Sequence, residues 1–168
     1  MKLTIDVEND VLKRGGKIHM DPFEADNKLV MVGILTDKGN EYLFRTDTDE
    51  QTVWVEKIQS LLDSATMLIG HNIMWLWESN FTYNGEIFDT MLGEYILQRG
   101  QKQPLSLEAC AERYNLETKK QSTMKEYFKN GTLMSEVPPK ELAEYLSADL
   151  HATQELYNEI HKKAWFQC

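Results

Sequence analysis

Apolar and polar residues alternate over residues 3–8, in the order Leu-Thr-Ile-Asp-Val-Glu. A strand with this period of two directs its apolar side chains to one face and its polar side chains to the other. Asp6 and Glu8 therefore lie side by side on the polar face. Neighbouring carboxylates repel each other unless water or a cation lies between them, and a divalent cation neutralises them most strongly. The alternative is an edge strand whose polar face is simply solvated.

Further apolar runs predict the other strands of a sheet. Residues 28–36 (KLVMVGILT) are apolar almost throughout, as in a central strand that is buried on both faces. After the turn residues 37–40, residues 41–45 (EYLFR) predict another strand. We expect these first three strands to be consecutive and antiparallel, with a loop or irregular hairpin over 9–27. Two later strands are predicted over 66–70 and 87–89.

Helical periodicity appears between and after these strands. It predicts helices over 52–64, 73–78, 90–98 and 107–114, the last with Ser106 as its cap. Pro138 and Pro139 open a long final helix, because proline costs no hydrogen bond in a first turn. This order of elements predicts an α/β fold in which helices pack against a mixed sheet. A length of 168 residues suits one well-buried core, so we expect a single domain over 1–168.

Charge and cysteine content narrow the class of protein. The formal net charge of −9 argues against nucleic-acid binding by bulk electrostatics, but an acidic site that recruits divalent cations becomes locally positive. Cys110 and Cys168 lie far apart, so we expect no structural disulfide and a reducing, cytoplasmic setting. No apolar run approaches the roughly 18 residues of a membrane span, and the N-terminus lacks a signal-peptide layout. We therefore expect a soluble, intracellular protein without a membrane partner.

The final helix carries a carboxylate where the core is expected. Its apolar stripe consists of Leu142, Leu146, Leu156 and Ile160. Asp149 lies on this stripe, where a carboxylate is costly unless a cation meets it. Tyr145, four residues earlier, emerges from the same helix face. We expect Asp149 to close on Asp6 and Glu8 around metal, with Tyr145 beside them. The alternative is that Asp149 pairs with a lysine and Tyr145 merely packs.

Three short motifs follow one another along the chain. Asp6-x-Glu8 lies on the first strand, Asn72 follows a later strand, and Tyr145-x-x-x-Asp149 lies on a late helix. Together they resemble the DEDD superfamily of 3'-5' exonucleases, in its tyrosine-containing branch. The sequence FDTML at 88–92, followed by YIL at 95–97, is similar to the proofreading domain of family A DNA polymerases, especially phage-type ones. The resemblance spans nearly the whole chain.

This resemblance implies an activity, a cofactor and a fold. The activity is metal-dependent hydrolysis of the terminal phosphodiester at a single-stranded DNA 3' end. Asp6, Glu8 and Asp149 would bind two divalent ions, Mg²⁺ or Mn²⁺, and Tyr145 would position the nucleophilic water. Two such ions, roughly 3.5–4 Å apart, suit this reaction because they stabilise the attacking and the leaving oxygens. The implied fold is a ribonuclease H-like mixed β-sheet, with a three-strand antiparallel start and further parallel strands, flanked by helices.

The second motif departs from the family pattern. The family normally places a fourth carboxylate four residues after the asparagine, and here that position is Leu76. About one helical turn also looks missing before residues 74–77, a loss that could remove the ligand and keep the fold. Glu78 is a candidate substitute, and Asp89 is another, although its family counterpart looks structural. Without the fourth carboxylate, we expect the exonuclease activity to be impaired. The alternative hypothesis is a catalytically silent module that binds DNA or a polymerase partner.

Residues around the second motif are candidates for contacting substrate. His71 can contact a phosphate or make a local hydrogen bond, and Asn72 can bind substrate or hold its loop. Trp75 and Trp77 can stack on bases or pack in the core. The lysines over 119–129, with Tyr127 or Phe128 among them, can guide single-stranded DNA or form a solvated face.

Length leaves no room for a polymerase domain beside the exonuclease-like one. We therefore expect a chain that acts alone or that is one part of a larger polymerase, in a bacterial or phage-infected host cell. The partners expected are a single-stranded DNA 3' end and a polymerase domain or replication protein. A further hypothesis is an RNA-trimming relative of ribonuclease D.

Overall fold

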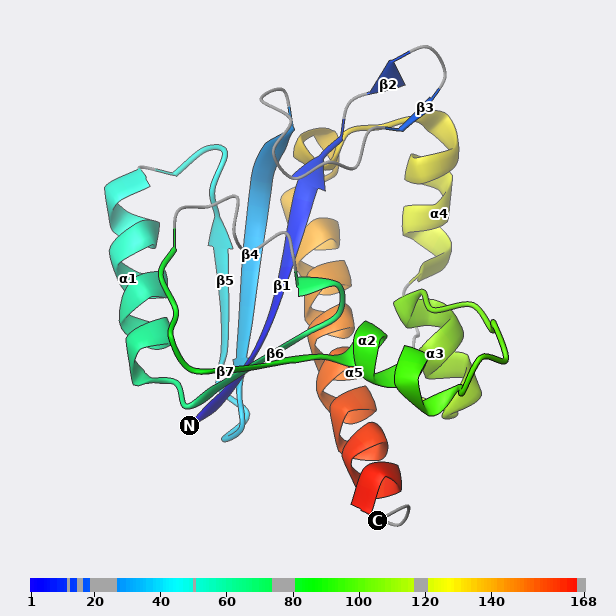
Figure 1. Cartoon of the computed structure of the whole chain (residues 1–168). Helices are drawn as coiled ribbons and strands as arrows, with labels where there is room; N and C mark the ends of the chain where they lie inside the picture. Colours follow the sequence, from blue (N-terminus) through cyan, green and yellow to red (C-terminus); the bar gives the residue numbers. More distant parts are fainter. Residues whose placement is uncertain are drawn as a thin grey trace.

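One mixed sheet forms the centre of the fold (Figure 1). The computed structural model describes residues 1–11, 13–14, 17–18, 27–49, 51–73, 81–116 and 121–165, and within these ranges five strands form the sheet in the order β5-β4-β1-β6-β7. The strands are β1 (Lys2–Asp10), β4 (Lys28–Thr36), β5 (Glu41–Arg45), β6 (Met67–Gly70) and β7 (Glu86–Asp89). The first three pair antiparallel, whereas β6 runs parallel to both β1 and β7. The predicted ribonuclease H-like mixed sheet is therefore confirmed.

The remaining described elements are mostly helical. They are α1 (Gln51–Ser64), α2 (Thr90–Leu97), α3 (Leu107–Arg113), α4 (Gln121–Asn130), the 3₁₀ turn η2 (Met134–Glu136) and α5 (Pro139–Trp165). Ser106 caps α3 as predicted, through a hydrogen bond from the backbone N–H of Ala109. Two short strands, β2 (Lys13–Arg14) and β3 (Lys17–Ile18), pair with each other, which agrees with the irregular hairpin expected between β1 and β4.

Alternation along β1 divides the core between the two faces of the sheet. Leu3 and Ile5 are buried in a cluster with Trp54 and Ile58 of α1. The opposite face of β1 meets α5, which runs antiparallel to the strand (Figure 1). Burying the apolar face under α1 thus leaves the polar positions of β1 facing the final helix.

Close approach of α5 to the sheet depends on β4. The buried side chains of Leu146 and Leu150 lie over Gly33, where a Cβ atom would be 2.7 Å from Cδ1 of Leu150. Near the start of β1, Lys2 Nζ donates a hydrogen bond of 2.9 Å to the hydroxyl of Tyr157. These contacts fix α5 along β1 and so decide which of its residues meets Asp6. Within the described ranges, no helix has the length and apolar character needed to cross a bilayer.

Candidate metal and active site

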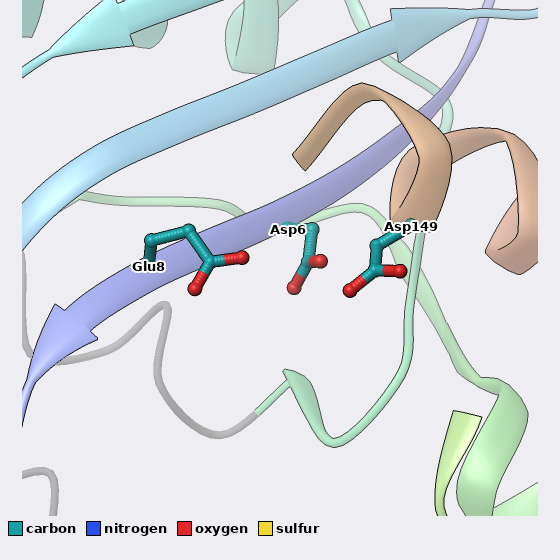
Figure 2. A group of neighbouring side chains, drawn as sticks. All are labelled: Asp6, Glu8 and Asp149. Carbon is teal, nitrogen blue, oxygen red and sulfur yellow. The ribbon is translucent and has the colours of Figure 1, made fainter. Parts of the chain in front are cut away.

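Three carboxylates from two elements meet at the centre of the sheet. Asp6 and Glu8 come from β1 and Asp149 comes from α5, and each offers an oxygen that lies within 4.8 Å of the other two. Figure 2 shows the three carboxylates on the same side of β1, with Asp6 between the other two. Oxygen ligands at this spacing form the donor set that hard divalent cations such as Mg²⁺ and Mn²⁺ prefer.

The electrostatics of the cluster favour a cation. Burial, followed by the charge of Asp149, raises the pKa of Asp6 to about 8. Burial and the charges of both aspartates raise the pKa of Glu8 well above its usual value. Burial is also the main cause that raises the pKa of Asp149 to about 6. A divalent ion among these oxygens would offset the repulsion, so the residues present fit such an ion.

Tyr145 lies one helical turn before Asp149, and its phenol is near enough to lower the pKa of that carboxyl group. Burial and the charges of Asp149 and Glu8 raise the pKa of Tyr145 far above its usual range. The side chain is therefore a neutral phenol beside the carboxylate cluster.

An exposed aromatic ring lies beside this tyrosine. Phe128 of α4 is 44% exposed, and its ring meets that of Tyr145 edge to face, with centroids 6.2 Å apart. Tyr127 is half-buried, and its hydroxyl donates a hydrogen bond to Glu141. Of the two aromatic residues that the sequence offered here, Phe128 is the one whose ring is open to solvent next to the cluster.

The turn after β6 places His71 and Asn72 near the same end of the sheet. Nε2 of His71 lies 2.8 Å from the carbonyl oxygen of Leu105, and Nδ1 lies 2.9 Å from Oγ1 of Thr90. Both ring nitrogens thus have partners inside the protein, and burial lowers the pKa of the ring. Asn72 has a positive φ of 59°, and no described residue is hydrogen-bonded to its side-chain amide.

Several predicted candidates lie outside the described residues. They are Leu76, at the position of the family's fourth acid, the substitute candidate Glu78, and the two tryptophans Trp75 and Trp77. Asp89, the other substitute candidate, is described and accepts backbone hydrogen bonds from the turn after β6 and from the first turn of α2.

One acid near the cluster was missed from the sequence. The negative charge of Glu108, on α3, contributes to the raised pKa of Asp149. Its carboxylate also pairs with Lys125 of α4 at 2.5 Å. Glu108 lies in the first turn of α3, and no spacing rule within a helix links it to residue 149.

Comparisons with known proteins identify the family of the chain and a structure of similar fold. A family model described as 3'-5' exonuclease matches residues 18–165, which include Tyr145 and Asp149 but begin after Asp6 and Glu8. A solved structure of the family B DNA polymerase from the hyperthermophilic archaeon Pyrobaculum calidifontis is similar in fold, with a TM-score of 0.62 and 14% identity. The similarity covers 95% of this chain and 24% of that polymerase chain. No curated protein sequence matches.

Proposed function

The chain belongs to the 3'-5' exonuclease family, and on this premise we propose that it removes nucleotides from the 3' end of single-stranded DNA by metal-dependent hydrolysis. The observation that carries the proposal is the meeting of Asp6, Glu8 and Asp149 within 4.8 Å, with Tyr145 one helical turn before the last of them. The two first-strand acids lie outside the family match, so their arrival at Asp149 supports the site independently of it.

Asp6, Glu8 and Asp149 would hold the Mg²⁺ or Mn²⁺ ions. When bound, such ions supply the positive charge that activates water and stabilises the attacking and leaving oxygens of a phosphodiester. The raised pKa values of the three carboxyl groups mean that the ions and protons compete for the same oxygens. Loading of the site should therefore improve as pH rises.

Tyr145 would orient the attacking water without taking its proton. A phenol with a raised pKa is a poor general base at neutral pH. The neutral phenol keeps its proton, and its oxygen can accept a hydrogen bond from a water molecule. Phe128, exposed beside Tyr145, would offer a stacking surface for a base of the single strand.

A polymerase context is part of the proposal. The chain spans about a quarter of the length of the polymerase that it resembles in fold. We propose that it acts beside a polymerase domain or replication protein and trims the 3' end that such a partner extends.

A second candidate function is nucleic-acid binding without turnover. Leu76 stands at the position of the family's fourth carboxylate. Loss of one ligand from a two-metal site weakens the binding of at least one ion. Such a module would hold a single strand and release no nucleotides.

The deciding experiment measures nucleotide release from a 3'-labelled single-stranded DNA oligomer in Mg²⁺, Mn²⁺ or EDTA. An RNA oligomer of the same sequence tests the ribonuclease alternative. Asp6→Asn removes one charge of the cluster, and Asp63→Asn, at an exposed position on α1, is the matched control. We expect metal-dependent release that Asp6→Asn lowers by orders of magnitude and Asp63→Asn leaves intact. Binding of the oligomer without release under any metal would favour the silent module.

A further inference from the structure

Asp89 connects the turn after β6 with the start of α2. As the N-cap of α2, its Oδ1 accepts hydrogen bonds from the backbone N–H groups of Met91, at 2.8 Å, and Leu92, at 3.3 Å. The same carboxylate also accepts from the backbone of Asn72 and of Ile73, each at 3.1 Å. An N-cap needs only the first pair of bonds, so the second pair performs a separate task.

That second pair fixes an uncommon backbone conformation. Asn72 has a φ of 59°, in the left-handed region that asparagine adopts more readily than most residues. The turn is also tight, because a Cβ atom on Gly70 would lie 3.0 Å from the side chain of Ile73. Two charge-assisted hydrogen bonds from Asp89 to consecutive amides hold this conformation in place.

The neighbouring residue holds the same turn from its other side. Thr90, which is fully buried, contacts Nδ1 of His71 and donates a hydrogen bond of 3.0 Å to the carbonyl oxygen of Gly70. The pair Asp89 and Thr90 thus fixes the turn through its backbone and through the His71 ring. Of the two polar side chains in the turn, the Asn72 amide is left without a partner among the described residues.

The turn lies at the level of the carboxylate cluster. β6 runs parallel to β1 with Ile69 paired to Thr4, so the chain leaves the sheet at the height of Asp6. Figure 2 shows the pale green turn after β6 on the open side of the carboxylates, away from β1. A single strand of nucleic acid that enters the carboxylate cluster would therefore pass this turn.

We propose that Asp89 is a positioning residue for the nucleic-acid strand. By fixing the backbone at Asn72 and Ile73, it holds the Asn72 amide at the edge of the cluster, where that amide hydrogen-bonds polar groups of the terminal nucleotide. The inference rests on the proposed function, because it requires a single strand at Asp6, Glu8 and Asp149.

The test separates the two tasks of Asp89. Asp89→Ser keeps a good N-cap for α2, but a single short hydroxyl cannot also reach the amides of Asn72 and Ile73. Ser106→Ala removes the cap of α3, where Ser106 accepts from Ala109 at 3.3 Å, and leaves the four hydrogen bonds of Asp89 in place. We expect Asp89→Ser and Asn72→Gly each to raise KM, and the Kd for a single strand in EDTA, by up to about tenfold, the loss of one hydrogen bond; glycine removes the amide and takes the positive φ of residue 72 without strain. The double variant should show no further loss, because both changes remove the same contact.

A structural readout runs in parallel. Amide hydrogen exchange at Asn72 and Ile73 should speed up in Asp89→Ser, whereas Met91 and Leu92 should stay protected by the retained cap. Ser106→Ala should lower thermal stability and leave KM and Kd unchanged.

The outcomes distinguish this inference from the function on which it rests. Wild-type KM and Kd in Asp89→Ser, or fully additive losses in the double variant, would overturn the positioning role while nucleotide release by the unaltered chain upheld the exonuclease. If the unaltered chain neither releases nucleotides nor binds the single strand, both proposals fail together.

Discussion

Gly33 on β4 is the register partner of Asp6 on β1, and its lack of a side chain lets α5 lie against the sheet at that point. A Cβ atom on Gly33 would be 2.7 Å from Leu150 and 3.0 Å from Leu146, the side chains that flank Asp149 on α5. The distance between the two aspartates is thus set by the residue beside Asp6.

Gly33→Ala should therefore disturb both packing and metal binding. The new methyl group must displace Leu150, which we expect to lower the free energy of unfolding by about 1–3 kcal/mol. Affinity for Mn²⁺, measured by calorimetric titration, should fall as Asp149 moves away from Asp6. Leu150→Ala makes room for the methyl group, so the double variant should lose less stability than the sum of the single changes. Unchanged Mn²⁺ affinity in Gly33→Ala would show that Gly33 does not set the spacing.

Metal-free stability should fall as pH rises from about 4 to 8. The pKa of Asp6 is raised from 3.8 to about 8 on folding, so the folded state binds more protons than the unfolded state in this range. Stability then decreases with pH, the reverse of a salt-bridged acid. Thermal unfolding in EDTA at pH 5 and pH 8 measures this difference.

Two comparisons check that the carboxylate cluster causes this pH dependence of stability. Asp6→Asn should flatten the pH dependence in EDTA, and Asp63→Asn should not. Saturating Mn²⁺ should raise the melting temperature more at pH 8 than at pH 5, since the ion binds the deprotonated carboxylates. A melting temperature in EDTA that rises between pH 5 and pH 8 would contradict the pKa shifts.

Tyr145→Phe should lower kcat and leave the fold intact. The change removes the hydroxyl that would orient water, and that hydroxyl also lowers the pKa of Asp149. Without it the Asp149 pKa rises, so the acidic limb of the pH–rate profile should move to higher pH. Steady-state kinetics across pH test both effects. A lower kcat with an unmoved acidic limb would show that the Tyr145 hydroxyl does not influence the pKa of Asp149.

Phe128→Ala should weaken binding of a single strand. Loss of one aromatic stacking surface typically costs about 1–3 kcal/mol of binding free energy. Fluorescence anisotropy with a labelled oligomer in EDTA measures this loss. Tyr95→Ala, which removes another exposed aromatic ring from α2, is the matched control and should leave the Kd unchanged. Equal effects of the two changes would mean that Phe128 has no special place in binding.

A buried ion pair between α2 and α3 should matter for stability. Glu94 is 2% exposed and its carboxylate accepts from Arg113 at 2.6 Å and from the hydroxyl of Tyr114 at 2.7 Å. Arg113→Ala leaves this carboxylate buried without its cation, so we expect a loss of about 3–5 kcal/mol in urea unfolding. Lys162→Ala, in the exposed pair with Glu159, should change stability far less. Similar small losses in both variants would place Glu94 in contact with solvent.

Periodicity in the sequence predicted the five strands of the sheet and most of the described helices, although not α4, and it predicted the face on which their side chains lie. The strands over 28–36 and 41–45 agree with β4 and β5 in both bounds, and the final helix begins at Pro139. The alternation over 3–8 placed Asp6 and Glu8 on one face, and the apolar stripe of the last helix placed Asp149 toward the core. These properties are local, because a period of two or 3.6 residues fixes direction within one element.

Only the tertiary structure decided how those faces meet. Asp149 lies close to Asp6 because Leu150 packs directly over Gly33. No residue spacing within α5 predicts that contact. Three further interactions also join segments that are distant in sequence. They are the contacts of the His71 ring, the hydrogen bonds from the turn after β6 to Asp89, and the effect of the Glu108 charge on Asp149. Periodicity specifies the direction of a side chain, whereas the packing of sheet against helix sets the distance between two side chains, and the chemistry of the carboxylate cluster depends on that distance.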